Sequence, residues 1–87
     1  MKKVILFGND KCGSCKRWKP IYLRLIKEYQ VDASIKDIDI DKEDKERYNI
    51  TAIPVTLFLD DNGVELGRIL GSMDEDIARK QFDLYVG

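Results

Sequence analysis

Hydrophobic and polar positions recur with two periods along the chain, and the change of period separates strands from helices. Residues 3–8 form a nearly continuous apolar run that ends in glycine, which is typical of a strand covered on both faces. From about Ser14, apolar side chains recur every three or four residues, which predicts an amphipathic helix. Pro20 lacks a backbone N–H, so a kink is expected about one turn before it unless this segment begins the helix. The apolar stripe, interpreted as helix core, consists of Trp18, Ile21, Tyr22, Leu25, Ile26 and Tyr29.

The middle of the chain predicts a second strand and a short helix. Ala33–Asp41 alternates between apolar and acidic residues, with Ile38 and Ile40 on one face, so this strand is expected to be less buried than the first. A strand, helix, strand unit predicts a right-handed crossover between parallel strands. Residues 42–48 are too charged for a core and indicate a surface helix. The polar face of the strand carries Asp37, Asp39 and Asp41, which the alternation explains without a calcium site.

The last third of the chain predicts a hairpin and a final helix. Val55–Leu59 and Val64–Leu70 flank a turn that contains Asn62-Gly63, a pair that tolerates positive φ and signals a hairpin. Ser72, with Glu75 three residues later, has the pattern of a capping box at a helix start. The stripe of this helix consists of Ala78, Phe82 and Tyr85, with Ile77 beside it.

Length and charge exclude several classes of protein. The 87 residues are enough for one domain, 1–87, and too few for two. Fifteen Lys and Arg against sixteen Asp and Glu give a net charge of −1, so no basic surface of the whole molecule recruits nucleic acid or an anionic membrane. No apolar run has the length of an export signal or a membrane span. The expectation is a soluble cytoplasmic protein that acts as a monomer.

The chemistry-bearing residues are two cysteines, because the chain has no histidine. This excludes the usual histidine-dependent triads and imidazole metal sites. Cys12-Gly13-Ser14-Cys15 lies between the first strand and the helix, where free backbone N–H groups and the helix dipole favour a thiolate. Such a thiolate attacks a disulfide, and a thiol three residues later resolves the mixed disulfide. Four cations, Lys11, Lys16, Arg17 and Lys19, face only one nearby carboxylate, Asp10.

Three other interpretations of the pair are weaker. Tetrahedral zinc needs four ligands, so here carboxylates or a second chain, as in a zinc-bridged dimer, would have to complete the site. A structural disulfide in so small a ring would add little stability. A buried inert pair conflicts with the flanking Lys11 and Lys16. The sequence therefore favours a redox pair, with Cys12 as nucleophile, Cys15 as resolving thiol, and no metal or other cofactor.

These motifs resemble the thioredoxin-like family over nearly the whole chain, from Lys3 to Tyr85. The residues that carry the resemblance are Cys12-Gly13-Ser14-Cys15-Lys16, Pro20, Ile53-Pro54 before the strand with Thr56, and Gly71 after the last strand. The resemblance implies an α/β thioredoxin-like fold with a four-stranded mixed sheet and helices on both faces. It implies a cis bond before Pro54 and substrate contacts at Ile53 and Pro54. It implies reduction of protein disulfides, with electrons from a separate reductase resembling thioredoxin reductase.

The chain also departs from the typical family pattern. It begins without the usual extra strand and helix, and Lys11 replaces the tryptophan that commonly precedes the first cysteine. The substrate face, to which Lys11 and the sterically open Gly13 are assigned, is therefore more cationic. Leu6 stands where the family has a buried aspartate beneath the second cysteine. Deprotonation of Cys15 must then use solvent or another group, for which Asp10 and Asp37 are candidates.

Two alternative functions stay open at this stage. A glutaredoxin-like reductase would use the basic surroundings to hold the carboxylates of glutathione, although residues 70–74, Leu-Gly-Ser-Met-Asp, lack the paired glycines and aspartate of that family. A binding module would keep the fold and use the basic face for a partner, with incidental cysteines. The reduction potential, the direction of electron flow and the physiological target do not follow from the sequence.

Overall fold

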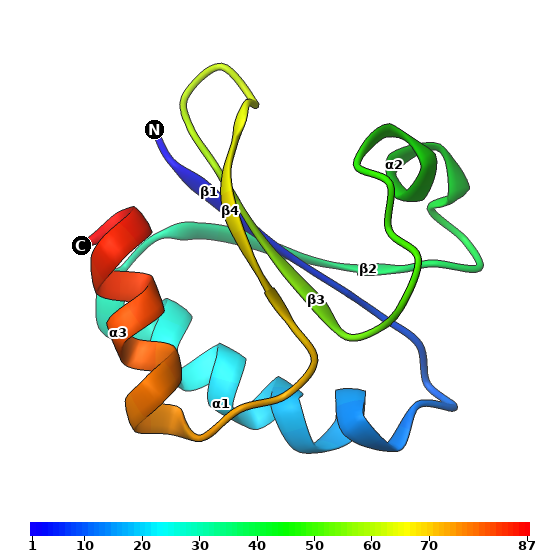
Figure 1. The fold of residues 1–87 in the computed structure, drawn as a ribbon, viewed down its shortest axis with the longest axis horizontal. Coiled ribbons are helices and arrows are strands. Elements are labelled where there is room, and N and C mark those ends of the chain that lie inside the picture. Colours follow the sequence, from blue (N-terminus) through cyan, green and yellow to red (C-terminus); the bar gives the residue numbers. More distant parts are fainter.

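Four strands form one mixed sheet in the computed structural model, which describes residues 1–87 (Figure 1). The strands lie in the order β2-β1-β3-β4, with β1 parallel to β2 and antiparallel to β3, and with β3 antiparallel to β4. Helices α1 and α3 lie on one side of the sheet and α2 on the other. The element bounds are β1 Lys3–Gly8, α1 Gly13–Tyr29, β2 Asp32–Asp37, α2 Lys42–Arg47, β3 Val55–Leu59, β4 Glu65–Leu70 and α3 Glu75–Val86.

The core has two layers because β1 and β3 bury side chains on both faces. Between the sheet and helices α1 and α3 lies the larger cluster, in which Trp18 and Phe82 are completely buried. The prediction of a doubly covered first strand and of a buried helix stripe at Trp18 and Tyr22 is confirmed. The full cluster is Val4, Leu6, Trp18, Tyr22, Leu25, Phe58, Ile69, Ala78 and Phe82.

The opposite face holds a smaller cluster that α2 covers only in part. It consists of Ile5, Phe7, Ile50, Val55, Leu57 and Leu59. Arg68 of β4 lies on this side, where its guanidinium donates 2.9 Å to the Tyr48 carbonyl and 2.7 Å to the Glu65 carboxylate. The bond to Tyr48 connects the C-terminal end of α2 to the sheet. The charged side chain of Arg68 therefore covers part of the smaller cluster.

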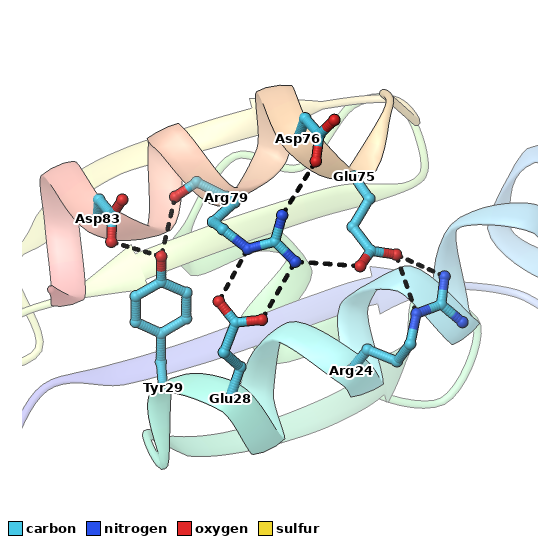
Figure 2. Close-up of polar contacts among 7 residues, drawn as sticks. All are labelled: Arg24, Glu28, Tyr29, Glu75, Asp76, Arg79 and Asp83. Carbon is cyan, nitrogen blue, oxygen red and sulfur yellow. Dashed lines mark hydrogen bonds and ion pairs between the residues drawn. The ribbon is translucent and has the colours of Figure 1, made fainter.

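An ion-pair network joins α1 to α3 (Figure 2). The Arg79 guanidinium donates to the Glu28 carboxylate of α1 at 2.8 and 3.1 Å and to Glu75 of its own helix at 3.1 Å. Glu75 also accepts two bonds from Arg24 of α1, at 2.9 and 2.6 Å. Because these groups face each other across the helix pair, they bridge α1 and α3 on their solvent-exposed side.

The predicted second strand is four residues too long at its C-terminal end. β2 ends at Asp37, because that residue begins a turn: its carboxylate accepts the Asp39 N–H at 2.8 Å, and its carbonyl accepts the N–H groups of Ile40 and Asp41. Ile40 is consequently 79% exposed. The prediction of a strand was wrong over residues 38–41. Aspartate side chains accept backbone N–H groups and so stabilise a turn in place of a strand.

The predicted capping box at Ser72 is also wrong. α3 begins at Glu75 with Asp74 as its N-cap, and no side chain caps it. Glu75 cannot reach back to a cap residue because Arg24 and Arg79 hold its carboxylate.

The hairpin prediction is confirmed, and residues 60–64 connect its two strands. Within this turn only Gly63 has a positive φ, of 81°. The Asp60 carboxylate accepts the backbone N–H groups of Asn62 and Val64 at 2.8 and 2.9 Å. Asp60 thus organises the turn, in which the left-handed conformation falls on glycine alone.

Candidate active site

One end of the sheet gathers segments that are far apart in the sequence. The antiparallel register places Phe7, at the end of β1, opposite Val55 at the start of β3, and Val55 opposite Leu70 at the end of β4. The Gly71 N–H donates to the Pro54 carbonyl at 2.8 Å, which joins the loops before β3 and after β4. α1 begins only five residues beyond β1, so its N-terminus lies at this same end (Figure 1).

Cys12 is the N-cap of α1. Its backbone is extended, with φ −93° and ψ 115°, and its sulfur accepts the backbone N–H of Cys15 at 3.2 Å. The sulfur therefore receives one of the N–H groups that a helix start leaves without a partner. The sequence prediction of a sulfur at the positive end of the helix dipole is confirmed.

The surroundings of Cys12 favour its thiolate. A hydrogen bond from the Cys15 thiol lowers the pKa of Cys12 below its usual value, and the backbone N–H groups of Cys15 and Ser14 and the charge of Arg17 act in the same direction. Arg17 is held nearby, because its Nη2 donates to the Ser14 hydroxyl at 3.1 Å. Partial exposure of Cys12 leaves its sulfur accessible.

Cys15 has the opposite character. It is buried, with 7% of its surface exposed. Burial, followed by the hydrogen bond to Cys12, raises the pKa of Cys15 to about 11. The two thiols thus differ in their readiness to ionise, and the accessible Cys12 ionises more readily than the buried Cys15 beside it.

Gly8 packs against the buried sulfur. A methyl group at Gly8 would lie 3.2 Å from the Cys15 sulfur, so only glycine fits there without a shift. From the sequence, Gly8 is predicted solely to end a strand, and this contact was not predicted. No local signal distinguishes the two roles, since the contact depends on how α1 docks.

A cavity of about 350 Å³ opens beside Cys15, between the start of α1 and β2. Leu6 lines it, at the position where the family pattern has aspartate, and so do the carboxylate-bearing Asp10 and Asp37. Asp37 of β2 lies beside Gly8 of β1 in the strand register. Paired residues face the same side of a sheet, so the Asp37 side chain points to the side on which Gly8 contacts Cys15. The structure therefore brings both candidate carboxylates to the cavity beside Cys15. The other lining residues are Gly8, Asn9, Lys16, Lys19, Ile35 and Lys36.

The predicted substrate platform lies at the same end of the sheet. The Ile53–Pro54 peptide bond is cis, as the resemblance implied. Pro54 is buried and Ile53 is half-buried, while Lys11 and Gly13 on either side of Cys12 are exposed. All six predicted site residues therefore lie in the loop after β1, at the start of α1 or in the loop before β3.

Two further residues support the site and were not predicted. Asn9 fastens the loop before Cys12: its side chain accepts the Lys11 N–H at 2.7 Å and donates to Asp39 at 2.6 Å, and its carbonyl accepts the Cys12 N–H at 3.2 Å. An asparagine directly after a strand is a turn signal, so the sequence did contain an indication of this role.

Thr56 accepts the Trp18 indole N–H at 2.8 Å, which only the tertiary structure shows.

The structure contains no group of three or more cysteine, aspartate or glutamate side chains placed to hold a metal ion. No helix is both long and apolar enough to cross a bilayer.

Comparisons with known proteins agree with this geometry. The family model described as Thioredoxin matches residues 1–82. The chain is 32% identical over 75 residues to Thioredoxin H-type of Oryza sativa subsp. indica, an alignment that covers 85% of this chain and 61% of that protein. It is 36% identical over 77 residues to Thioredoxin 1 of Plasmodium falciparum, covering 87% and 73%. The X-ray structure of Fasciola hepatica thioredoxin matches 97% of this chain and 80% of that chain with a TM-score of 0.86, at 29% identity.

Proposed function

Because the chain belongs to the thioredoxin family, we propose that it is a thiol–disulfide oxidoreductase that reduces protein disulfides through its Cys12–Cys15 dithiol. The observation that carries the proposal is the N-cap position of Cys12, where helix N–H groups and the Cys15 thiol lower the pKa of its sulfur. The buried companion thiol beside it supports a two-step exchange.

The reaction consists of two thiol–disulfide exchanges. The Cys12 thiolate attacks one sulfur of the substrate disulfide, whose S–S bond breaks, and the departing substrate sulfur takes up a proton. The Cys15 thiol then loses its proton and attacks the Cys12 sulfur, which breaks the mixed disulfide and releases the second substrate thiol. Two electrons have passed to the substrate, and the chain is left with a Cys12–Cys15 disulfide that a separate reductase returns to the dithiol.

The remaining site residues position the substrate. The backbone of Ile53 pairs with the extended substrate next to the disulfide, and the cis Pro54 holds that backbone at the open end of the sheet. Gly13 leaves the approach to the Cys12 sulfur clear, and Lys11 borders it with a positive charge. Support comes from the exposure of Lys11 and Gly13 and from the bond between Pro54 and Gly71.

Insulin reduction in the presence of dithiothreitol tests the proposal. The wild-type chain is expected to accelerate precipitation of the insulin chains, and Cys12→Ser is expected to lose all of this acceleration. In a separate reaction without dithiothreitol, which would cleave the mixed disulfide, Cys15→Ser is expected to accumulate a covalent adduct with insulin that mass spectrometry detects. Full activity of Cys12→Ser would remove the nucleophile assignment, and loss of activity in Cys15→Ser without any adduct would remove the resolving role.

A reductant of this kind works in a reducing compartment, so we place the chain in the cytoplasm, as a monomer with a flavoprotein reductase as electron donor. Equilibration with glutathione buffers measures the relevant potential. A value more reducing than about −180 mV is expected, and a more oxidising value contradicts the reductase role. Rapid re-reduction by glutathione alone would instead favour the glutaredoxin-like alternative. A Cys12 pKa at the free value of about 8.5 would favour a binding module.

A further inference from the structure

The site is bordered by an unbalanced group of positive charges, the cationic rim: Lys11, Lys16, Arg17 and Lys19. We propose that this rim selects protein substrates whose disulfide is flanked by acidic residues, an inference that rests on the proposed function. The rim would act on the rate at which such substrates reach Cys12 and on how they are oriented there.

The charge of the rim contrasts with that of the rest of the molecule. Four cations and one carboxylate, Asp10, give residues 10–19 a charge of +3, so the remaining residues carry −4 within a net charge of −1. All four rim side chains are exposed. None takes part in an ion pair, whereas Arg24, Arg68 and Arg79 all do. The rim charges are therefore available to a partner.

Each residue of the cationic rim lies near Cys12 or Cys15. The Arg17 side chain lies along the start of α1, because its Nη1 is 3.7 Å from the position that a Cβ atom on Gly13 would occupy. Its charge contributes to the lowered pKa of Cys12. Lys16 and Lys19 line the cavity that contains Cys15, and Lys11 directly precedes Cys12. The four cations thus surround the two sulfurs, with the carboxylates of Asp10 and Asp37 in the same cavity as Lys16 and Lys19.

The opposite border of the site carries no charge. Residues 49–54, Asn-Ile-Thr-Ala-Ile-Pro, are uncharged, and so are residues 71–73, Gly-Ser-Met. The bond between Gly71 and Pro54 joins these two loops. A substrate that lies along the uncharged loops meets on its other side the four exposed cations of the rim. These outnumber the carboxylates of Asp10 and Asp37 in the adjacent cavity, so acidic side chains are favoured there over basic ones.

Electrostatic complementarity of this type acts mainly on association rate and on discrimination between partners. Charge-lined sites raise on-rates by about 10- to 1,000-fold at low ionic strength. Exposed charges act over about 30 Å at 0.01 M salt and about 3 Å at 1 M. The selectivity is expected to disappear at high salt, whereas selectivity from shape would persist.

Reduction of matched disulfide peptides tests the inference. Three peptides share one uncharged core and carry Glu, Gln or Lys on both sides of the disulfide, and kcat/KM is measured with dithiothreitol as donor. The Glu peptide is expected to exceed the Gln peptide about tenfold at roughly 0.01 M salt and to match it at about 1 M. The Lys peptide is expected to be the poorest.

A pair of double variants separates the rim from overall charge. Lys16→Gln with Lys19→Gln removes two rim charges, while Lys27→Gln with Lys80→Gln removes two exposed, unpaired charges elsewhere. The Glu-to-Gln ratio of kcat/KM cancels any change in Cys12 reactivity. The ratio is expected to fall about threefold or more in the rim variant and to stay unchanged in the other. Equal ratios in both variants, or a wild-type ratio near one, overturn the inference.

Two further outcomes have distinct meanings. Faster reduction of oxidised glutathione than of the Glu peptide would show that the rim serves a small anionic disulfide, and this also overturns the inference. If none of the three peptides is reduced, the proposed function itself fails. Reduction of all three at one rate leaves that function standing and removes only the selectivity.

Discussion

Cys12 and Cys15 are identical side chains that the fold makes chemically different. Cys12 caps a helix and receives an N–H group, whereas Cys15 is packed against Gly8 and buried. The hydrogen bond between the two thiols lowers the pKa of the first and raises that of the second. Removing either partner should therefore change the ionisation of the other.

Cys15→Ala is expected to raise the pKa of Cys12, because the largest cause of its lowered value is the bond from the Cys15 thiol. The thiolate fraction near neutral pH falls, and alkylation by iodoacetamide slows. A pH titration of thiolate absorbance measures the change. Cys15→Ser serves as the control, since its hydroxyl can still donate, and its Cys12 should titrate below that of the alanine variant. Identical titrations of all three proteins would contradict this role of the thiol.

Thr56→Val should destabilise the fold, because it leaves the buried Trp18 indole N–H without its acceptor at 2.8 Å. An unsatisfied buried donor costs about 1–3 kcal/mol. Urea denaturation followed by circular dichroism gives the free energy of unfolding. Thr56→Ser keeps the hydroxyl and should retain most of the stability. A valine variant as stable as wild type would show that the bond contributes nothing net.

At the scale of the elements, an ion pair connects the edge strand β2 to the short helix α2, where few apolar side chains pack. Lys36 of β2 forms an ion pair with Asp44 of α2, and both side chains are about one quarter exposed, 26% and 23%. The bond to Lys36 lowers the pKa of Asp44, and the bond to Asp44 raises the pKa of Lys36. This pair connects the short α2 to an edge strand.

Asp44→Asn is therefore expected to lower the free energy of unfolding, by about 0.5 kcal/mol as for other partly exposed pairs. A lowered carboxyl pKa stabilises the fold above the unfolded value of about 3.9 and loses this effect as pH falls through the folded value. The raised lysine pKa preserves the effect below about 10.4 and loses it as pH rises further. Denaturation across pH should show the difference at neutral pH and none in strong acid. A constant difference at all pH values would contradict the ion-pair origin.

At the scale of the whole molecule, one sheet connects both core clusters. β1 sends Val4 and Leu6 to the larger cluster and Ile5 and Phe7 to the smaller. Neither layer can lose its packing without exposing the same strand. The 87 residues should therefore unfold as one domain.

Urea unfolding is expected to be a single two-state transition with a slope of about 1–3 kcal/mol per molar. Trp18 fluorescence reports the larger cluster, and the NMR ring signals of Tyr48, whose ring lies 6.4 Å from Phe7, report the smaller. Far-ultraviolet circular dichroism reports the helices. The three transitions should coincide. Separate midpoints would show that the layers unfold independently.

The sequence alone determined the order of elements and the sulfur pair at the start of a helix, because each follows from local spacing. Apolar periods distinguish strands from helices over a few residues. Cys12 and Cys15 lie next to each other on any helix that begins there. The motif around Pro54, through its resemblance to a family, also indicated the cis bond that the structure contains.

The tertiary structure decided which distant groups meet. The end of β2 at Asp37, the bond of Trp18 to Thr56 and the contact of Gly8 with the Cys15 sulfur all depend on docking between elements. The pairing of Glu75 with Arg24 across two helices likewise displaced the predicted cap. Spacing along a chain does not encode these distances, because they are set only when the helices pack on the sheet.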